Sequence, residues 1–182
     1  MADWTDPSEL QVVVGDRPRA AQQNGLVDNA TFLYDAPGVA VRLTAPQEVA
    51  GDTDALISWS EAPWDSTGGA MWDAGSPGSI LIPRSGRWLF HCSTLWDGSA
   101  GDDSKRAIFL ERDDVRIRGV QVPAVNPAEV IVTGITNLAE DSFLEFVVRQ
   151  TSGGPLDLRP NRTVATVQWV GPMVGPPDEA DS

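Results

Sequence analysis

The sequence predicts an all-β domain of the antiparallel sandwich class. Residues of high β propensity recur in about nine short runs, at spacings of about 8 to 15 residues, with turn residues between them. The 17 glycines and 14 prolines are spread through the chain, as the many turns of a sandwich require. Strands do not alternate with helices, so the pattern disfavours an α/β enzyme fold. A chain of 182 residues can form one such domain with a short arm.

Residues 1–37 differ from the rest and predict an N-terminal attachment arm with a short helix. Asp16 is a suitable N-cap for a helix over residues 17–33, and Pro18 falls in its first turn, where proline is tolerated. The run 36–38 (Ala-Pro-Gly) ends the segment. The predicted helix has a weak apolar stripe made of Ala21, Val27, Ala30 and Leu33.

Residues 38–174 form the predicted β domain, and residues 175–182 form an acidic tail. Each predicted strand is rich in β-branched and aromatic residues and is bounded by turn residues. Asp113 and Asp114 form a two-residue hairpin turn between two of the strands. The predicted strands are 39–44, 55–59, 79–83, 87–96, 106–111, 115–122, 129–136, 143–150 and 164–170.

Charge and cysteine content exclude several classes of function. The net charge of −13 disfavours nucleic acid as a partner, because phosphate binding needs a concentrated positive surface. The single cysteine, Cys92, excludes an internal disulfide, and its strand pattern predicts a buried, inert thiol. The N-terminal residues lack the basic and apolar regions of a signal peptide, and no run approaches the ~18 apolar residues of a membrane span. We therefore expect a protein made in a cytoplasm, without membrane insertion.

Five of the 13 basic residues cluster in one part of the sequence. Arg116 and Arg118 alternate with apolar residues, so we interpret the cluster as the solvated face of an antiparallel strand. The alternative is a stripe that binds an anion or a partner. The cluster consists of Lys105, Arg106, Arg112, Arg116 and Arg118.

Catalytic chemistry has little support in the sequence. His91 is the one histidine, whereas a cupin-type metal site needs two or three, and its strand phase places it opposite the apolar face. Asp97, Asp102 and Asp103 share one loop, and aspartates 113–114 form the next turn. These carboxylates could bind calcium if the two segments converge at one end of the sandwich, but they do not match the spacing of a calcium loop, and solvated turn aspartates are the favoured interpretation. Facing carboxylates of the glycosidase kind are not evident. We predict no catalytic residue, no metal and no cofactor.

Tryptophan is frequent, with seven residues in the chain. Trp64 and Trp72 fall in a predicted polar loop, where a large aromatic side chain folds back onto the core or faces a partner. Together with Trp96 they are the candidate contacts for a ligand, such as a sugar ring, or for a neighbouring subunit. The candidates for the core or a trimer axis are Trp88, Phe90, Phe146 and Trp169.

The order of motifs resembles the tumour-necrosis-factor-like jelly roll, the globular head also found in complement and in many phage virion proteins. Gly86-x-Trp88 looks like the Gly-x-Tyr that begins the long central strand of that family, with Trp in place of Tyr. The resemblance covers about residues 39–171 and implies a non-enzymatic, trimeric domain. It rests on the aromatic and glycine-rich run 64–73, the strands 80–83 and 86–90, the segment 143–158 with its Ser152-Gly153 turn, and the closing strand 167–171.

The N-terminal segment carries a second resemblance, to small virion proteins of tailed phages of actinobacteria. In that family a Trp, a Gly, Thr-Ala, an Asn, Arg-Asp-Asn and Phe-Leu precede a globular head and look like an attachment element. Arg19 replaces the Thr and Val27 replaces the Arg, so the match is partial. The resemblance implies that the attachment residues are Trp4, Asn24, Asp28, Asn29, Phe32 and Leu33.

The two resemblances predict a structural protein of a virion, made in the host cytoplasm. It would be a homotrimer of jelly rolls that is anchored to other virion proteins by its arm. A minor tail or tail-fibre component that contacts the host surface, including a surface glycan, is the first expectation. The alternatives are a capsid decoration protein of the same fold, a monomeric carbohydrate-binding module and, least favoured, a divergent enzyme.

Overall fold

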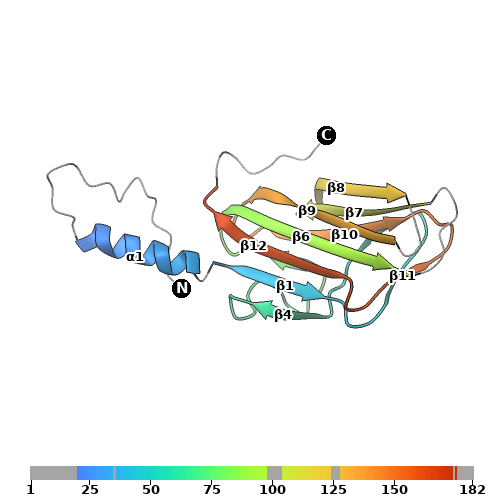
Figure 1. Cartoon of the computed structure of the whole chain (residues 1–182), viewed down its shortest axis with the longest axis horizontal. Coiled ribbons are helices and arrows are strands. Elements are labelled where there is room, and N and C mark those ends of the chain that lie inside the picture. The colour runs from blue at the N-terminus through green and yellow to red at the C-terminus, as the bar shows by residue number, and fades with distance from the viewer. Residues whose placement is uncertain (1–19, 35, 98–103, 124–127, 174, 176–182) are drawn as a thin grey trace. The chain divides into compact units, whose positions relative to one another are not determined.

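The computed structural model describes residues 20–34, 36–97, 104–123, 128–173 and 175 (Figure 1). The chain divides into two units, Met1–Ala36 and Pro37–Ser182. The first contains helix α1, Ala20–Tyr34, so the structure confirms the predicted helix, whose expected start and cap lie outside the described residues. Within the part of the chain that the structure describes, no helix is both long and apolar enough to cross a membrane.

The apolar stripe predicted for α1 was wrong. Val27 and Ala30 are exposed, and so is Leu26, whereas Gly25 and Asn29 are buried. Gly25 and Asn29 are four residues apart and therefore share one helix face. The helix buries a small and a polar residue and leaves two large aliphatic side chains in solvent, which the apolar periodicity could not indicate.

The second unit consists of two antiparallel sheets (Figure 1). The seven-stranded sheet has the order β2-β11-β6-β12-β1-β4, and β9 pairs with the other side of β6. Its strands are β1 (Gly38–Arg42), β2 (Gln47–Val49), β4 (Glu61–Asp65), β6 (Gly86–Trp96), β9 (Ala128–Leu138), β11 (Leu156–Leu158) and β12 (Val164–Gly171).

The five-stranded sheet has the order β3-β10-β7-β8, and β5 also pairs with β10. Side chains from the two sheets interleave between them, which makes the unit a β-sandwich. The strands are β3 (Asp54–Leu56), β5 (Ser79–Leu81), β7 (Lys105–Arg112), β8 (Val115–Pro123) and β10 (Phe143–Gln150).

All nine predicted strands are present, and three further strands were missed. Two of these, β2 and β11, have three residues each and pair with one another, so neither shows a period that a sequence pattern can reveal. The third, β4, carries Pro63 and was expected to be a loop. It lies at the edge of its sheet, where a proline is tolerated because its missing N–H does not interrupt a ladder.

The hairpin between β7 and β8 confirms the predicted turn. Asp113 and Asp114 have φ angles of 49° and 65°, the pair of positive values that a two-residue type I′ turn requires. Just beyond the turn, Leu110 pairs with Arg118 and Glu111 pairs with Arg116, so Ile117 is the extra residue of a β-bulge. The bulge puts Arg116 and Arg118 on opposite sides of the sheet. The interpretation of these two arginines as one solvated face was therefore wrong.

The core lies between the sheets and contains the four residues expected there. Trp88, Phe90 and Phe146 are fully buried, and Trp169 is 2% exposed. The glycine of the Gly-x-Trp motif is required by packing, because a Cβ atom at Gly86 would lie 2.1 Å from Nε1 of Trp169. Cys92 is buried between the same sheets, and burial raises the pKa of its thiol, as expected for an inert cysteine.

Candidate functional site

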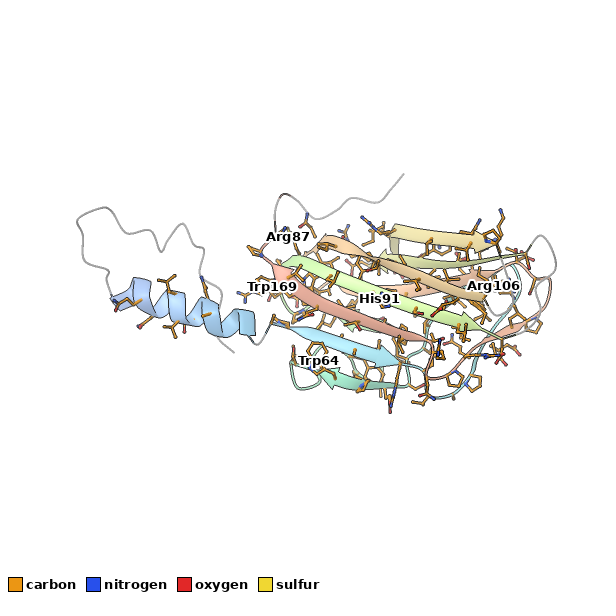
Figure 2. The ribbon with its side chains drawn as sticks, viewed as in Figure 1. Trp64, Arg87, His91, Arg106 and Trp169 are labelled. Atoms are coloured by element: carbon orange, nitrogen blue, oxygen red, sulfur yellow. The ribbon has the colours of Figure 1, made fainter. Side chains whose placement is uncertain are left out.

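The candidate site is the outer face of the seven-stranded sheet, and β6 holds its centre. Even-numbered residues of β6, such as Trp88 and Phe90, point into the core, so Leu89 and His91 point outward. The registers of β9 and β12 extend these positions into rows across the sheet. Figure 2 shows where His91 lies on β6. One row contains Gly38, Gln168, Leu89 and Ile135, and the next contains Trp64, Ala40, Thr166, His91 and Thr133.

This outer face exposes four large aliphatic side chains. The exposed fractions are 39% for Leu89, 49% for Ile131, 52% for Ile135 and 38% for Val170. In the two rows around His91, that histidine is the one ionisable side chain among the described residues. An antiparallel sheet that faces water normally carries polar residues on its wet side. Large exposed apolar patches are frequent at surfaces that bind partners, which makes this face the candidate site.

Sequence reasoning did not find the aliphatic residues of this patch. A signal was present in β9, where Val130, Ile131 and Val132 are consecutive and so place apolar side chains on both sides of the strand. Phe146, a candidate for the core or the axis, belongs to β10 of the other sheet and lies in the core. The four aromatic residues proposed for core or axis lie inside the sandwich, so the patch on its surface is built from different residues.

His91 lies at the centre of the patch without the partners that catalysis needs. It is half-buried between Thr166 of β12 and Thr133 of β9, and the Thr133 hydroxyl donates to the carbonyl oxygen of Phe90 at 3.0 Å. The strand register places these two threonines beside it, and neither neighbour is a carboxylate that could orient the ring for catalysis. The described residues contain no group of three or more His, Cys, Asp or Glu side chains that could hold a metal ion.

The three candidate tryptophans have different environments. Trp64 of β4, labelled in Figure 2, is 42% exposed. Its ring lies across Gly38, where a Cβ atom would be 2.6 Å from Cη2. Trp72 folds back, and its Nε1–H donates to the carbonyl oxygen of Pro77 at 3.1 Å. Trp96 is 1% exposed, which removes it from the surface contacts. Trp64 alone of the three presents a large exposed ring, at the margin of the patch.

The aspartates weighed as calcium ligands have structural partners where the structure describes them. Asp97 accepts a hydrogen bond from Nε of Arg159 at 2.7 Å, and this pairing raises the pKa of the arginine. Asp113 accepts from the backbone N–H of Phe143 at 2.8 Å and so ties the hairpin turn to β10. Asp102 and Asp103 lie outside the described residues.

The proposed attachment residues are only partly described. Asn24 and Asp28 are exposed on α1, and Asn29 is buried. Trp4 lies outside the described residues, as do the side chains of Phe32 and Leu33. The structure therefore supports a helix in the arm and does not test the roles of these residues.

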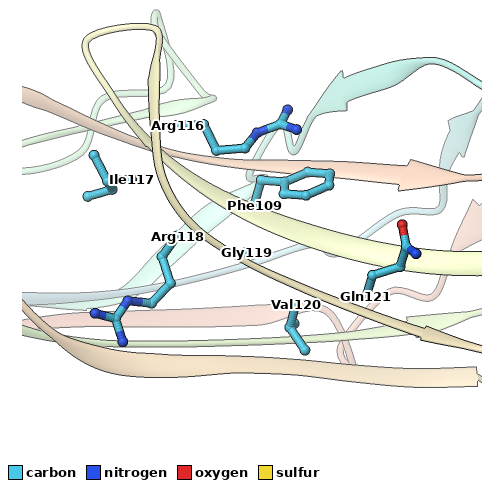
Figure 3. A pocket seen from close by; sticks show the side chains of 7 residues that line it. All are labelled: Phe109, Arg116, Ile117, Arg118, Gly119, Val120 and Gln121. Carbon is cyan, nitrogen blue, oxygen red and sulfur yellow. The ribbon is translucent and has the colours of Figure 1, made fainter. Parts of the chain in front are cut away.

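A shallow groove lies along β8, on the other side of the sandwich (Figure 3). Its volume is about 250 Å³, and the guanidinium of Arg116 stacks on the ring of Phe109 at 3.5 Å. Arg116 also donates to Glu111 at 3.0 Å and to Asp54 at 2.9 Å. These contacts hold the arginine flat on the surface, so its charge is already paired and the groove is not a free anion site.

Comparison with known proteins supports the architecture through structure and not through sequence. No protein-family model matches this chain, and none of the curated proteins matches it. Among solved structures, Eiger TNF from S. frugiperda aligns over 79% of this chain and 99% of its own, with 15% identity and a TM-score of 0.58. Murine APRIL aligns over 74% of this chain and 98% of its own, with 11% identity and a TM-score of 0.54.

The domain has the tumour-necrosis-factor-like jelly-roll fold. The predicted fold is therefore confirmed, both as a sandwich and as this jelly roll. The neighbours align over nearly their whole length, so the likeness covers a complete domain and not an isolated hairpin. Identities of 11% and 15% show the fold alone, because one fold supports many functions.

Proposed function

We propose that this chain is a non-catalytic head domain that assembles as a homotrimer through the outer face of the seven-stranded sheet. The observation that carries the proposal is the exposed apolar patch of Leu89, Ile131, Ile135 and Val170 on that face. Apolar side chains that are central and uncharged are typical of the buried core of a subunit interface. A threefold arrangement closes on itself and so buries the patch of every copy.

A virion role is the finer part of the proposal and rests on the N-terminal segment. The partial resemblance to tailed-phage proteins supports an arm that attaches the trimer to other virion proteins. Helix α1 fits an attachment element because Leu26 and Val27 are 58% and 64% exposed. We favour a minor tail or fibre component with its loops toward the host surface, and capsid decoration remains the alternative placement.

The assembly can be tested by expressing tagged and untagged chains together. Native mass spectrometry of the mixture should show every combination of the two chains in a three-subunit complex. A trimer gives two mixed species, whereas a dimer would give one and a monomer would give none. Either of those results would contradict the proposed trimer.

The virion role requires a separate experiment. An antibody raised against the domain should label purified particles of the phage that encodes it, at one position along the tail. Labelling spread over the capsid would replace the tail placement with the decoration alternative. Particles that contain no copy of the chain by mass spectrometry would end the virion proposal while leaving the trimer untouched.

One observation favours a second function, binding of a glycan. The ring of Trp64 is 42% exposed and is supported from beneath by Gly38, as a stacking platform for a sugar would be. A single tryptophan offers a small platform, which is why we rank this function second. Saturable, sugar-dependent quenching of tryptophan fluorescence that Trp64→Ala abolishes would establish it.

A further inference from the structure

Arg106 is a charged side chain buried inside the sandwich. It is the second residue of β7 and has the inward phase of Ile108 and Leu110, and its exposed fraction is 1% (Figure 2). In the two ladders of β7 it stands beside Gln150 and Val122. Charged residues are rarely buried to this extent unless another charge pairs with them.

The described residues do not supply that charge. Nη1 of Arg106 donates to the carbonyl oxygen of Lys105 at 2.9 Å, while Nε has no hydrogen-bond partner. Each of the salt bridges among the described residues involves an arginine other than Arg106. The ring of Trp96 lies 5.6 Å from the guanidinium carbon and gives a cation–π contact, which stabilises the charge less than a carboxylate would.

The polar neighbour in the ladder, Gln150, is already fully engaged. Its Nε2 donates to the carbonyl oxygens of Val49 at 3.1 Å and Gly154 at 2.6 Å. Its Oε1 accepts from the backbone N–H of Ser152 at 2.7 Å. The amide oxygen is therefore turned toward the 150–154 turn and is occupied there.

Two more unpartnered polar atoms lie on the facing strand. Nε1 of Trp96 and Oγ1 of Thr94 are buried on β6 and have no hydrogen-bond partner in the structure. Both residues have the inward phase of β6, two positions apart, so their Cα atoms are about 7 Å apart. The indole N–H can only donate a hydrogen bond, whereas the hydroxyl can donate one or accept one. Trp96, whose ring lies 5.6 Å from the guanidinium carbon of Arg106, thus places a second unsatisfied donor beside the arginine, and Thr94 lies two positions before it on β6.

This combination is unfavourable without a further group. Burial lowers the pKa of Arg106, yet arginine stays protonated in proteins because its ordinary pKa is so high. A buried positive charge and two unsatisfied polar atoms would each cost several times the net gain of an ordinary hydrogen bond. An anion within hydrogen-bonding reach of these groups would offset their costs, since it accepts hydrogen bonds from each donor.

We propose that a small inorganic anion, with chloride as the representative, binds between the two sheets at Arg106, Trp96 and Thr94. The guanidinium supplies the charge, and the indole N–H and the hydroxyl donate hydrogen bonds to the ion. The site lies within one subunit and does not depend on the proposed trimer. Its role is to stabilise the end of the sandwich at which β6 ends and β7 begins.

Bromide, which replaces chloride and scatters anomalously, locates the ion directly. Crystals of the full chain grown in sodium bromide should show an anomalous peak within hydrogen-bonding distance of the Arg106 guanidinium and Nε1 of Trp96. A structure without such a peak overturns the proposal. So does one in which a carboxylate of the chain occupies this position.

Thermal unfolding tests the energetic role in solution. The melting temperature of the unmodified protein should be on the order of 5 °C higher in sodium chloride than in equimolar sodium gluconate. The exposed variant Arg162→Met should keep this difference, and Arg106→Met should lose it. Equal melting temperatures of the unmodified protein in the two salts would overturn the proposal, even if Arg106→Met does not fold.

Discussion

The two outer faces of the sandwich differ in the charged side chains that they carry. On the five-stranded sheet, Arg116 pairs with Asp54 and Glu111 at 2.9 and 3.0 Å, and Arg149 lies 3.7 Å from Asp54. On the seven-stranded sheet, the two rows around His91 carry apolar side chains, threonines and a glutamine, and the exposed Arg87 lies on the same face two residues before Leu89. The Arg42–Glu61 pair of that sheet lies at its margin, on β1 and β4.

This difference is the basis for proposing the seven-stranded face, and not the five-stranded one, as the subunit interface. Paired surface charges would lose their hydration in an interface, and their attraction rarely compensates for that loss. Neutral and aliphatic side chains gain free energy when water is removed from them. Burying the seven-stranded face therefore costs less free energy than burying the five-stranded face.

The largest effect is expected from a charge placed in the patch. Ile135→Lys should weaken self-association at least a thousandfold, because every copy would bury an unpaired ammonium group. Sedimentation velocity over a dilution series measures the change. The matched control is Phe143→Lys on the five-stranded face, whose side chain is 47% exposed against 52% for Ile135. An equal loss of self-association in the two variants would contradict assembly through the seven-stranded face.

The next effect separates the inside of β6 from its outside. Trp88→Ala should lower the free energy of unfolding by about 3–5 kcal/mol through the cavity it leaves. Leu89→Ala, one residue further on and 39% exposed, should cost less than about 1 kcal/mol. Both are compared by urea unfolding in the Ile135→Lys background, so that assembly does not contribute. An unchanged transition for Trp88→Ala would contradict its place in the core.

A smaller effect is expected at the margin of the patch. Gly38→Ala should destabilise the domain by about 1–2 kcal/mol, because the new methyl group would meet the Trp64 ring and the carbonyl oxygen of Val167. Adding Trp64→Ala should restore most of that loss, since it removes the nearer contact. The double variant tests this by thermal unfolding, and a loss that persists in it would assign the strain to the backbone.

The smallest effect belongs to the charged face. Arg116→Met should lower stability by about 1 kcal/mol or less, since exposed ion pairs contribute little. The loss should shrink further in concentrated salt, which screens such pairs. Guanidinium chloride would mask this dependence, so urea unfolding at two salt concentrations is the suitable measurement. A loss of several kcal/mol would show that the arginine network supports the fold.

The sequence predicted the fold well because the long strands carry a clear two-residue period. Trp88, Phe90 and Phe146 were correctly assigned as core or axis residues from that period and prove to be core. The patch escaped prediction because its residues become a surface only when β9 and β12 are placed beside β6. The bulge at Ile117 and the burial of Arg106 likewise depend on pairing between strands, which local patterns do not encode.

The most direct test of the central claim is the mass of the full chain in solution, measured by light scattering over a range of concentrations. We predict a stable mass three times the 19.5 kDa of one chain. A mass of 19.5 kDa at every concentration would contradict assembly through the seven-stranded face. It would also leave the exposed Trp64 as the strongest remaining candidate for a binding function.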